Sequence, residues 1–133
     1  MWICPECKRE FRNRNQDHSC GIFSIEKVIE NCDSVFPLFE IIRTLVLQFG
    51  EVKMIPVKNA VLFKVNSNFL AIKPHSTYLK IEFASTERHD EFPVEKTVQI
   101  SKTRFAHFIK IDSLENIDKQ LIAWLNEAYI SDL

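Results

Sequence analysis

Hydrophobic residues recur with helical spacing in two segments that precede the middle of the chain. Residues 24–31 place three apolar side chains on one face, which predicts a short helix. A second helix is predicted from a cap at Asp33 or Ser34 to about Phe49, where Gly50 occupies the position expected after a helix end. Apolar residues leave this helix only a narrow polar stripe. It is therefore either packed between two layers, which we favour, or in contact with a partner chain.

Between Glu51 and Ile111 the hydrophobic period changes to two, which is typical of strands with one buried face. Short connections with turn residues favour antiparallel neighbours. The predicted strands are Val52–Ile55, Ala60–Asn66, Phe69–Lys73, Tyr78–Phe83, Thr97–Ser101 and Phe105–Ile111. The buried face is expected to carry Val61, Phe63, Val65, Leu79, Ile81, Phe83, Val98 and Ile100. The wetter face is expected to carry Lys64, Asn66, Tyr78, Lys80, Glu82, Thr97 and Gln99.

A last helix is predicted to begin at Asp112 or Ser113, where Glu115 completes a capping-box-like start. Its apolar stripe is expected to include Ile117, Leu121, Trp124 or Leu125, and Ala128. The pattern from residue 23 onward therefore predicts an α+β domain, with a helix, a five- or six-stranded, mainly antiparallel sheet and a C-terminal helix.

The first part of the chain has a different pattern, because apolar residues are few and cysteines gather there. Cys4 and Cys7 are separated by two residues, and His18 and Cys20 follow ten residues later. Thiolates and an imidazole at such spacing are the ligands that zinc prefers. We expect Cys4, Cys7, His18 and Cys20 to hold one structural Zn²⁺ in a knuckle over residues 1–22, followed by an α+β domain over residues 23–133. A closed site with four ligands would supply folding energy that so small a segment lacks.

Two alternatives to this ligand set stay open. Cys32 could replace His18, because His18 and Cys20 are closer together than a usual second ligand pair; otherwise Cys32 is a small buried hydrophobe. Cys4 and Cys7 could instead form a redox pair, although such motifs normally follow a strand at a helix start.

Composition excludes several classes of function. The chain has 133 residues, a formal net charge of −1, and 15 aromatic residues counted as 11 Phe, 2 Trp and 2 Tyr, which is far too aromatic for a disordered protein. Only two glycines are present, so the glycine-rich loops that bind nucleotide cofactors are excluded. No apolar run is long enough to cross a membrane and the N-terminus lacks signal-peptide character, so we expect a cytoplasmic protein without membrane contact.

Basic residues suggest where an anionic partner could bind. Arg12 and Arg14 lie in the predicted knuckle, and Lys64, Lys73 and Lys80 lie on the predicted strands. Lys102, Arg104 and Lys110 extend this strip, with His75 and Tyr78 beside it. Such residues could contact a nucleic-acid backbone or another anion. Lysines also serve simply to solubilise a sheet face, which is the interpretation we weigh more heavily from sequence alone.

Several motifs together resemble those of an uncharacterised bacterial family of domains of unknown function. The N-terminal motif comprises Trp2, Cys4, Pro5, Cys7, Arg9 and Phe11, continued by Asn15, Gln16, His18 and Cys20. Central and C-terminal motifs comprise Phe69, Ile72, Pro74, then Ile117, Asp118, Leu121, Trp124, Leu125, Glu127, Ala128 and Tyr129. The resemblance implies a zinc knuckle before a small α+β domain, and favours His18 over Cys32. Knuckles of this kind often have Gly where this chain has Lys8, which implies some strain in that turn. The resemblance implies no activity. A weaker similarity links the α+β domain to frataxin-like domains proposed to handle iron.

The function predicted from these observations is that of a zinc-binding, non-catalytic module for a macromolecular partner, either nucleic acid or protein. A homodimer through the helix at residues 34–49 is a further prediction about partners. The alternatives are iron handling, for which Glu26 and Glu30 provide only a small acidic cluster, and an enzyme whose site the sequence does not reveal. His89 and Asp90 lie in a charged loop that we expect to be solvated. His107 alternates with Phe105 and Ile109, so we expect a hydrogen-bonded core histidine.

Overall fold

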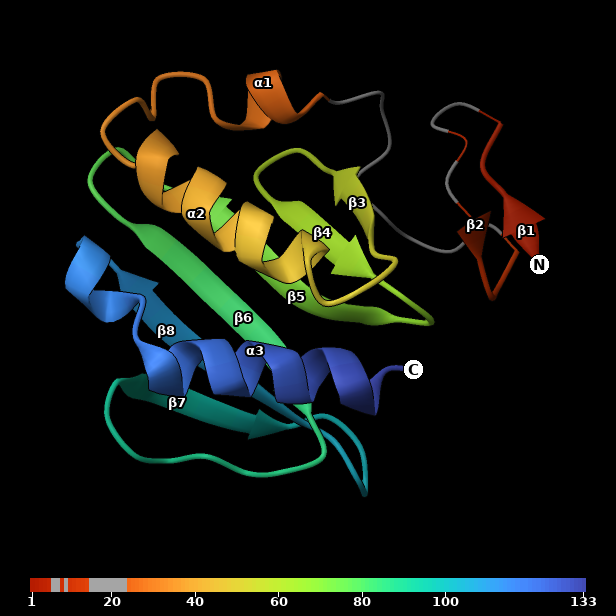
Figure 1. The fold of residues 1–133 in the computed structure, drawn as a ribbon. Coiled ribbons are helices and arrows are strands. Elements are labelled where there is room, and N and C mark those ends of the chain that lie inside the picture. Colours follow the sequence, from red (N-terminus) through yellow and green to blue (C-terminus); the bar gives the residue numbers. More distant parts are fainter. Residues whose placement is uncertain (6–7, 9, 15–23) are drawn as a thin grey trace.

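The computed structural model (Figure 1) describes residues 1–5, 8, 10–14 and 24–133. Residues 24–133 form a six-stranded antiparallel sheet with helices, which confirms the predicted α+β class and its closing helix. The strand order is β3-β4-β5-β6-β8-β7, so only the last two strands depart from chain order. The strands are β3 (Lys53–Pro56), β4 (Val61–Lys64), β5 (Asn68–Pro74), β6 (Leu79–Ser85), β7 (Val94–Gln99) and β8 (Phe105–Ile111).

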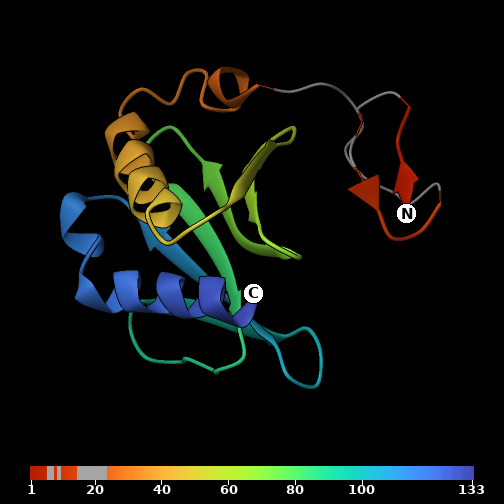
Figure 2. The ribbon, with the colours of Figure 1, turned by 45° about the vertical axis from the view of Figure 1, so that its right-hand side comes forward.

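Two helices pack against the same face of this sheet, which we call the inner face. Both α2 (Phe36–Leu47) and α3 (Lys119–Ser131) lie on that face in the two views of the ribbon (Figures 1 and 2). Their apolar stripes meet the inward side chains of the strands, since a helix stabilises a sheet by burying such a stripe. The buried helix residues are Phe39, Ile42, Val46, Leu121, Trp124, Leu125, Ala128 and Tyr129. The opposite surface, which we call the outer face, is covered by neither helix.

The end of α2 is held close to α3. The helix ends at Leu47, two residues before the predicted end, and Gly50 then adopts a φ of +158°. The hydroxyl oxygen of Tyr129 lies 2.1 Å from the point where a Cβ of residue 50 would stand. A side chain at Gly50 would therefore displace the Tyr129 ring from its contacts with Phe49 and Phe69.

Two helix boundaries differ from those predicted. α1 (Ile25–Val28) is capped by the Ser24 side chain but ends before Asn31, which adopts a left-handed φ of 64°. The predicted start of the last helix at Asp112 or Ser113 is wrong. Ser113 caps only a short 3-10 turn, η1 (Leu114–Asn116), and Asp118 caps α3 by accepting a hydrogen bond from the backbone N–H of Leu121 at 2.9 Å. Ile117 separates η1 from α3, because its ψ of 79° is not helical.

The predicted faces of β7 are also wrong, because the strand contains a register shift. Val94 pairs with Ile109 and Lys96 with Phe108, which leaves one extra residue in β7. The shift turns Thr97 to the inner face opposite His107 and Val98 to the outer face opposite Ala106. Val98 is accordingly 36% exposed rather than buried in the core.

The C-terminal end of α3 is tied to the turn between β4 and β5. The buried carboxylate of Asp132 accepts hydrogen bonds from the backbone N–H groups of Val65, Asn66 and Ser67, at 3.0–3.2 Å. Arg104 completes the cluster, since its Nη1 lies 3.7 Å from the same carboxylate and donates to the Ser67 hydroxyl at 2.8 Å. These contacts, which we call the Asp132 cluster, hold the C-terminal end of α3 against the turn between β4 and β5.

Candidate nucleic-acid interface

Three lysines lie in register across the outer face of the sheet. Lys73 on β5 is directly opposite Lys80 on β6, and Lys80 is directly opposite Lys110 on β8. Adjacent strands are about 4.8 Å apart, so this lysine row places three ammonium groups across roughly 10 Å. Two of the three belong to a contact: Lys80 pairs with Glu95 at 2.6 Å, and the Lys110 ammonium lies 4.8 Å from the centre of the Tyr78 ring. Lys73 forms no ion pair with any residue that the structure describes.

An aromatic pair lies at the same end of the sheet as the lysine row. The rings of His75 and Tyr78 stack with centres 4.4 Å apart and planes 15° apart. A hydrogen bond of 2.8 Å from the His75 backbone N–H to the Tyr78 carbonyl closes the turn between β5 and β6. The structure therefore brings together residues that the sequence predicted to be neighbours, namely Lys73, Lys80, His75 and Tyr78, with Lys110 beside them.

A second row of outer-face residues runs parallel to the lysines, two residues further along the strands. Ala71, Glu82, Phe108 and Lys96 are paired in that order across β5, β6, β8 and β7. Burial among its neighbours raises the pKa of the Glu82 carboxyl above its ordinary value. Phe108 is half-buried, and its ring centre lies 5.8 Å from the Lys96 ammonium. Phe108 was not among the predicted site residues, although the alternation of β8 places it on the same face as Lys110 rather than with His107.

The other predicted anion contacts are dispersed. Lys64 is half-buried on the outer face but pairs with Lys53 at the far end of β4, and Lys102 lies exposed in the turn between β7 and β8. Arg104 belongs to the Asp132 cluster. Arg12 and Arg14 are exposed after β2 (Glu10–Phe11), in the N-terminal segment.

The predicted zinc knuckle falls mostly outside the described residues, since Cys7, His18 and Cys20 are not among them. In the part that is described, β1 (Trp2–Ile3) pairs with β2, and the Lys8 backbone N–H donates to the Cys4 carbonyl at 2.8 Å. Lys8 has a φ of 64°, the left-handed conformation that favours glycine. The strain expected at Lys8 is therefore present in this turn. No group of three or more metal-binding side chains is found among the described residues.

Cys32 is placed by the α+β domain itself. It lies between α1 and α2, is half-buried, and packs against the hydrophobic core. Its backbone N–H donates to the carbonyl of Ile29 at 3.0 Å. This packing agrees with its interpretation as a small hydrophobe.

A histidine cluster holds the loop between β6 and β7 on the inner side. His89 is only 15% exposed; its ring stacks on Trp124 and its Nε2 lies 3.1 Å from Glu127 on α3. Its Nδ1 faces Glu91 at 3.5 Å, so a carboxylate lies beside each ring nitrogen. The loop itself is exposed, as expected, but the His89 side chain is held against α3. No local signal in the sequence indicates this contact, because Glu127 is far from His89 along the chain.

His107 is the buried, hydrogen-bonded histidine that the sequence predicted. Its Nδ1 lies 3.2 Å from the Phe83 carbonyl, and its Nε2 accepts from the backbone N–H of His89 at 3.0 Å. The two bonds fit a neutral ring that carries its proton on Nδ1. Burial lowers the pKa of His107 below its ordinary value, mainly because the charged ring would lose its hydration.

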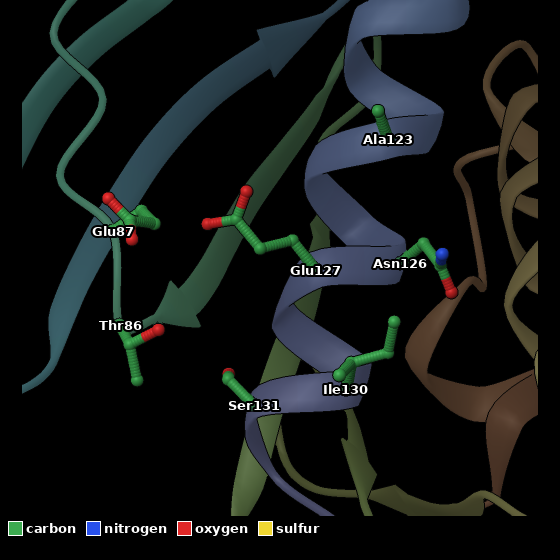
Figure 3. Close-up of a pocket in the computed structure, with 7 residues that line it drawn as sticks. All are labelled: Thr86, Glu87, Ala123, Asn126, Glu127, Ile130 and Ser131. Atoms are coloured by element: carbon green, nitrogen blue, oxygen red, sulfur yellow. The ribbon is translucent and has the colours of Figure 1, made fainter.

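A shallow, open pocket lies between α3 and the start of the same loop (Figure 3). Glu127 extends from α3 toward Glu87 on the facing segment, with Thr86 and Ser131 below them in that view. The hydrogen bond between His89 and Glu127 joins this loop to α3.

The predicted dimer helix is buried on one side only. Phe39, Ile42 and Val46 of α2 are inaccessible to solvent, whereas Phe36, Ile41 and Leu47 are 37–41% exposed. Glu40 and Arg43 form an ion pair of 3.1 Å on the exposed side. Apolar and charged residues therefore alternate on the surface that a second chain would meet.

The fold is that of a small α+β domain in which helices cover one face of an antiparallel sheet and lysines cross the other. The chain belongs to the DUF5655 family, a domain of unknown function, which matches residues 25–131. The match includes the central and C-terminal motifs and begins after the predicted knuckle. Comparison with curated proteins and with solved structures gave no match. No helix among the described residues is long and apolar enough to span a bilayer.

Proposed function

We propose that the protein is a non-catalytic binding module whose outer sheet face binds the phosphate backbone of a nucleic acid. The observation that carries this proposal is the register of Lys73, Lys80 and Lys110 across three neighbouring strands. Like charges directly opposite each other destabilise a sheet, so a lysine row is an unfavourable way to make a surface soluble. A phosphate backbone would neutralise the row and recover that energy.

The size of the lysine row sets the expected binding signal. If each lysine of the row neutralises one phosphate, the row makes about three phosphate contacts. Release of counterions from a single strand then predicts a slope of about −2 for log K against log salt concentration. Glu95 competes for Lys80, which leaves Lys73 and Lys110 as the side chains with the largest expected effect.

The test is a salt titration of fluorescence anisotropy with labelled oligonucleotides of about 12 nucleotides, which lies within known binding-site sizes. Lys73→Ala and Lys110→Ala should each weaken binding and make the salt slope less steep by about 0.7. Lys119→Ala is the matched control, because Lys119 is an exposed lysine at the start of α3 on the inner side. Absence of binding at low salt, or equal effects of all three variants, would contradict the proposal.

The second part of the proposal concerns the N-terminal segment, in which Cys4, Cys7, His18 and Cys20 would hold one structural Zn²⁺. Two observations support it: β1 and β2, which precede and follow Cys4 and Cys7 in the sequence, pair antiparallel, and Cys32 packs against the core of the α+β domain. The metal would fix the segment through four protein ligands, as closed zinc sites do.

Elemental analysis of untagged protein tests this second part. About one zinc per chain is expected, with loss in Cys4→Ser and His18→Ala. Cys32→Ser is the matched control and should keep its zinc, whereas loss of zinc in that variant would make Cys32 the fourth ligand. Bound iron in place of zinc would favour the alternative of iron handling.

The exposed side of α2 supports a further proposal about partners, namely pairing of two chains through residues 34–49. The exposed side chains of Phe36 and Leu47 are the observation that favours it. Light scattering coupled to gel filtration should then show a dimer that Phe36→Glu dissociates. A monomer at high concentration would contradict this proposal and leave the sheet face unaffected.

A further inference from the structure

Phe108 is an aromatic ring on the outer face that does not belong to the hydrophobic core of the described residues. It lies on β8, two residues from Lys110 on the same face, and is directly opposite Glu82 on one side and Lys96 on the other. The ammonium of the exposed Lys96 side chain lies over the ring, 5.8 Å from its centre. A planar ligand group can therefore reach Phe108 by displacing one lysine side chain.

We propose that the outer face selects single-stranded nucleic acid, with a base stacked on Phe108 while the phosphates follow the lysine row. This inference rests on the proposed function and names the form of its ligand. Base stacking on aromatic side chains is the usual way in which a sheet surface binds single strands, because every base offers a π-face. A duplex keeps its bases stacked on one another and leaves none for Phe108.

The charges of the two outer-face rows determine which row meets the phosphates of the nucleic acid and which row meets its base. The row that contains Phe108 also contains the carboxylate of Glu82, which repels phosphate. The neighbouring row contains Lys73, Lys80 and Lys110, which attract it. The two rows are two residues apart along the strands, or about 7 Å, which one nucleotide can span from phosphate to base.

Two further features support the same arrangement. Displacement of Lys96 from the Phe108 ring removes only a weak cation–π contact, so a base can replace this lysine on the ring at little cost. At the end of the lysine row, the stacked rings of His75 and Tyr78 provide a second aromatic surface for a neighbouring base.

The experiment compares anisotropy titrations of the full chain with a single strand of about 12 nucleotides and with the duplex of the same sequence. Phe108→Leu keeps an apolar side chain but removes the ring, and should weaken binding of the single strand roughly 5- to 150-fold without changing its salt slope. Phe108→Tyr keeps the ring and should bind like the parent. Phe92→Leu makes the same change at an exposed residue of the loop between β6 and β7 and should have no effect. Circular dichroism verifies that each variant is folded.

The outcomes separate this inference from the proposed function. Duplex binding as tight as that of the single strand, or equal binding by Phe108→Leu and the parent, would overturn single-strand selection while the effect of Lys73→Ala still upheld backbone binding. Absence of binding to either oligonucleotide would overturn both. Weaker binding of the single strand by Phe108→Leu but not by Phe108→Tyr supports stacking, because leucine keeps an apolar side chain and lacks only the ring.

Discussion

The two faces of the sheet differ in how their residues are paired across the strands. On the inner face, Ile72, Ile81 and Ile109 stand opposite one another, and all three are inaccessible to solvent. One position earlier or later along the same strands, the outer face pairs Lys73 with Lys80 and Glu82 with Phe108. The inner pairs are those that stabilise the fold, whereas the outer pairs include repulsion that a folded domain does not require. The outer face therefore contributes less to the stability of the fold than the inner face, which leaves its residues available for the binding that we propose.

The largest expected difference between the faces is found by truncating one phenylalanine on each. Phe83 is fully buried on β6, and Phe83→Ala should lower the free energy of unfolding by about 3–5 kcal/mol, because it leaves a cavity against Trp124 and His107. Phe108→Ala should lower it by less than about 1.5 kcal/mol. Urea denaturation of both variants measures the difference, and equal losses would show that the outer face is part of the core.

Removal of the Asp132 carboxylate should have the next largest effect. Asp132→Ala leaves three backbone N–H groups and the Arg104 guanidinium without their acceptor, so we expect a loss of about 2–4 kcal/mol. The exposed Asp112 offers a matched control, since Asp112→Ala should change the stability by less than about 0.5 kcal/mol. Thermal melts that place both variants close to the parent would mean that α3 does not depend on this cluster.

The inner face should also make the stability depend on pH. The pKa of His107 is lowered from 6.5 in the folded protein, so the unfolded chain binds a proton there more readily. The contribution of the neutral ring is fully present above about pH 6.5 and is lost as the pH falls through the lowered pKa. His107→Gln, which cannot titrate, should flatten this part of the curve in urea denaturation at several pH values. An unchanged curve would contradict the role of His107 in the acid loss.

The smallest effect concerns the lysine row and has the opposite sign. Lys73→Gln removes a like charge opposite Lys80 and should raise the free energy of unfolding by roughly 0.5 kcal/mol at low salt. The gain should disappear at about 1 M salt, where the Debye length falls to about 3 Å. Lys119→Gln should show no such gain. A Lys73→Gln variant that is less stable than the parent at low salt would contradict the contrast between the faces.

The sequence predicted the parts of this structure in which a local pattern decides the conformation. The six strands of the central sheet and the core position of His107 follow from alternation alone. Lys73 and Lys80 were correctly grouped with Tyr78, because alternation assigns all of them to one side of a hairpin.

The features that the sequence did not predict depend on contacts between distant residues or on a change of register. The inversion of β7 comes from one extra residue, which no local preference indicates. The burial of His89 depends on Trp124 and Glu127, which lie on α3, far from His89 along the chain. The last helix begins late because Asn116 caps the 3-10 turn through its own side chain, and both Ser113 and Asp118 are competent caps in the sequence.

The extra residue in β7 also bears on how this family can change its length. An edge strand has a neighbour on one side only, so an inserted residue there need be accommodated by β8 alone. The same insertion in β6, which is paired on both sides, would reverse inward and outward residues against two neighbours. Homologous chains should therefore tolerate single-residue insertions and deletions near residues 95 and 96. In a chain that lacks the extra residue, apolar and polar positions after it would be exchanged.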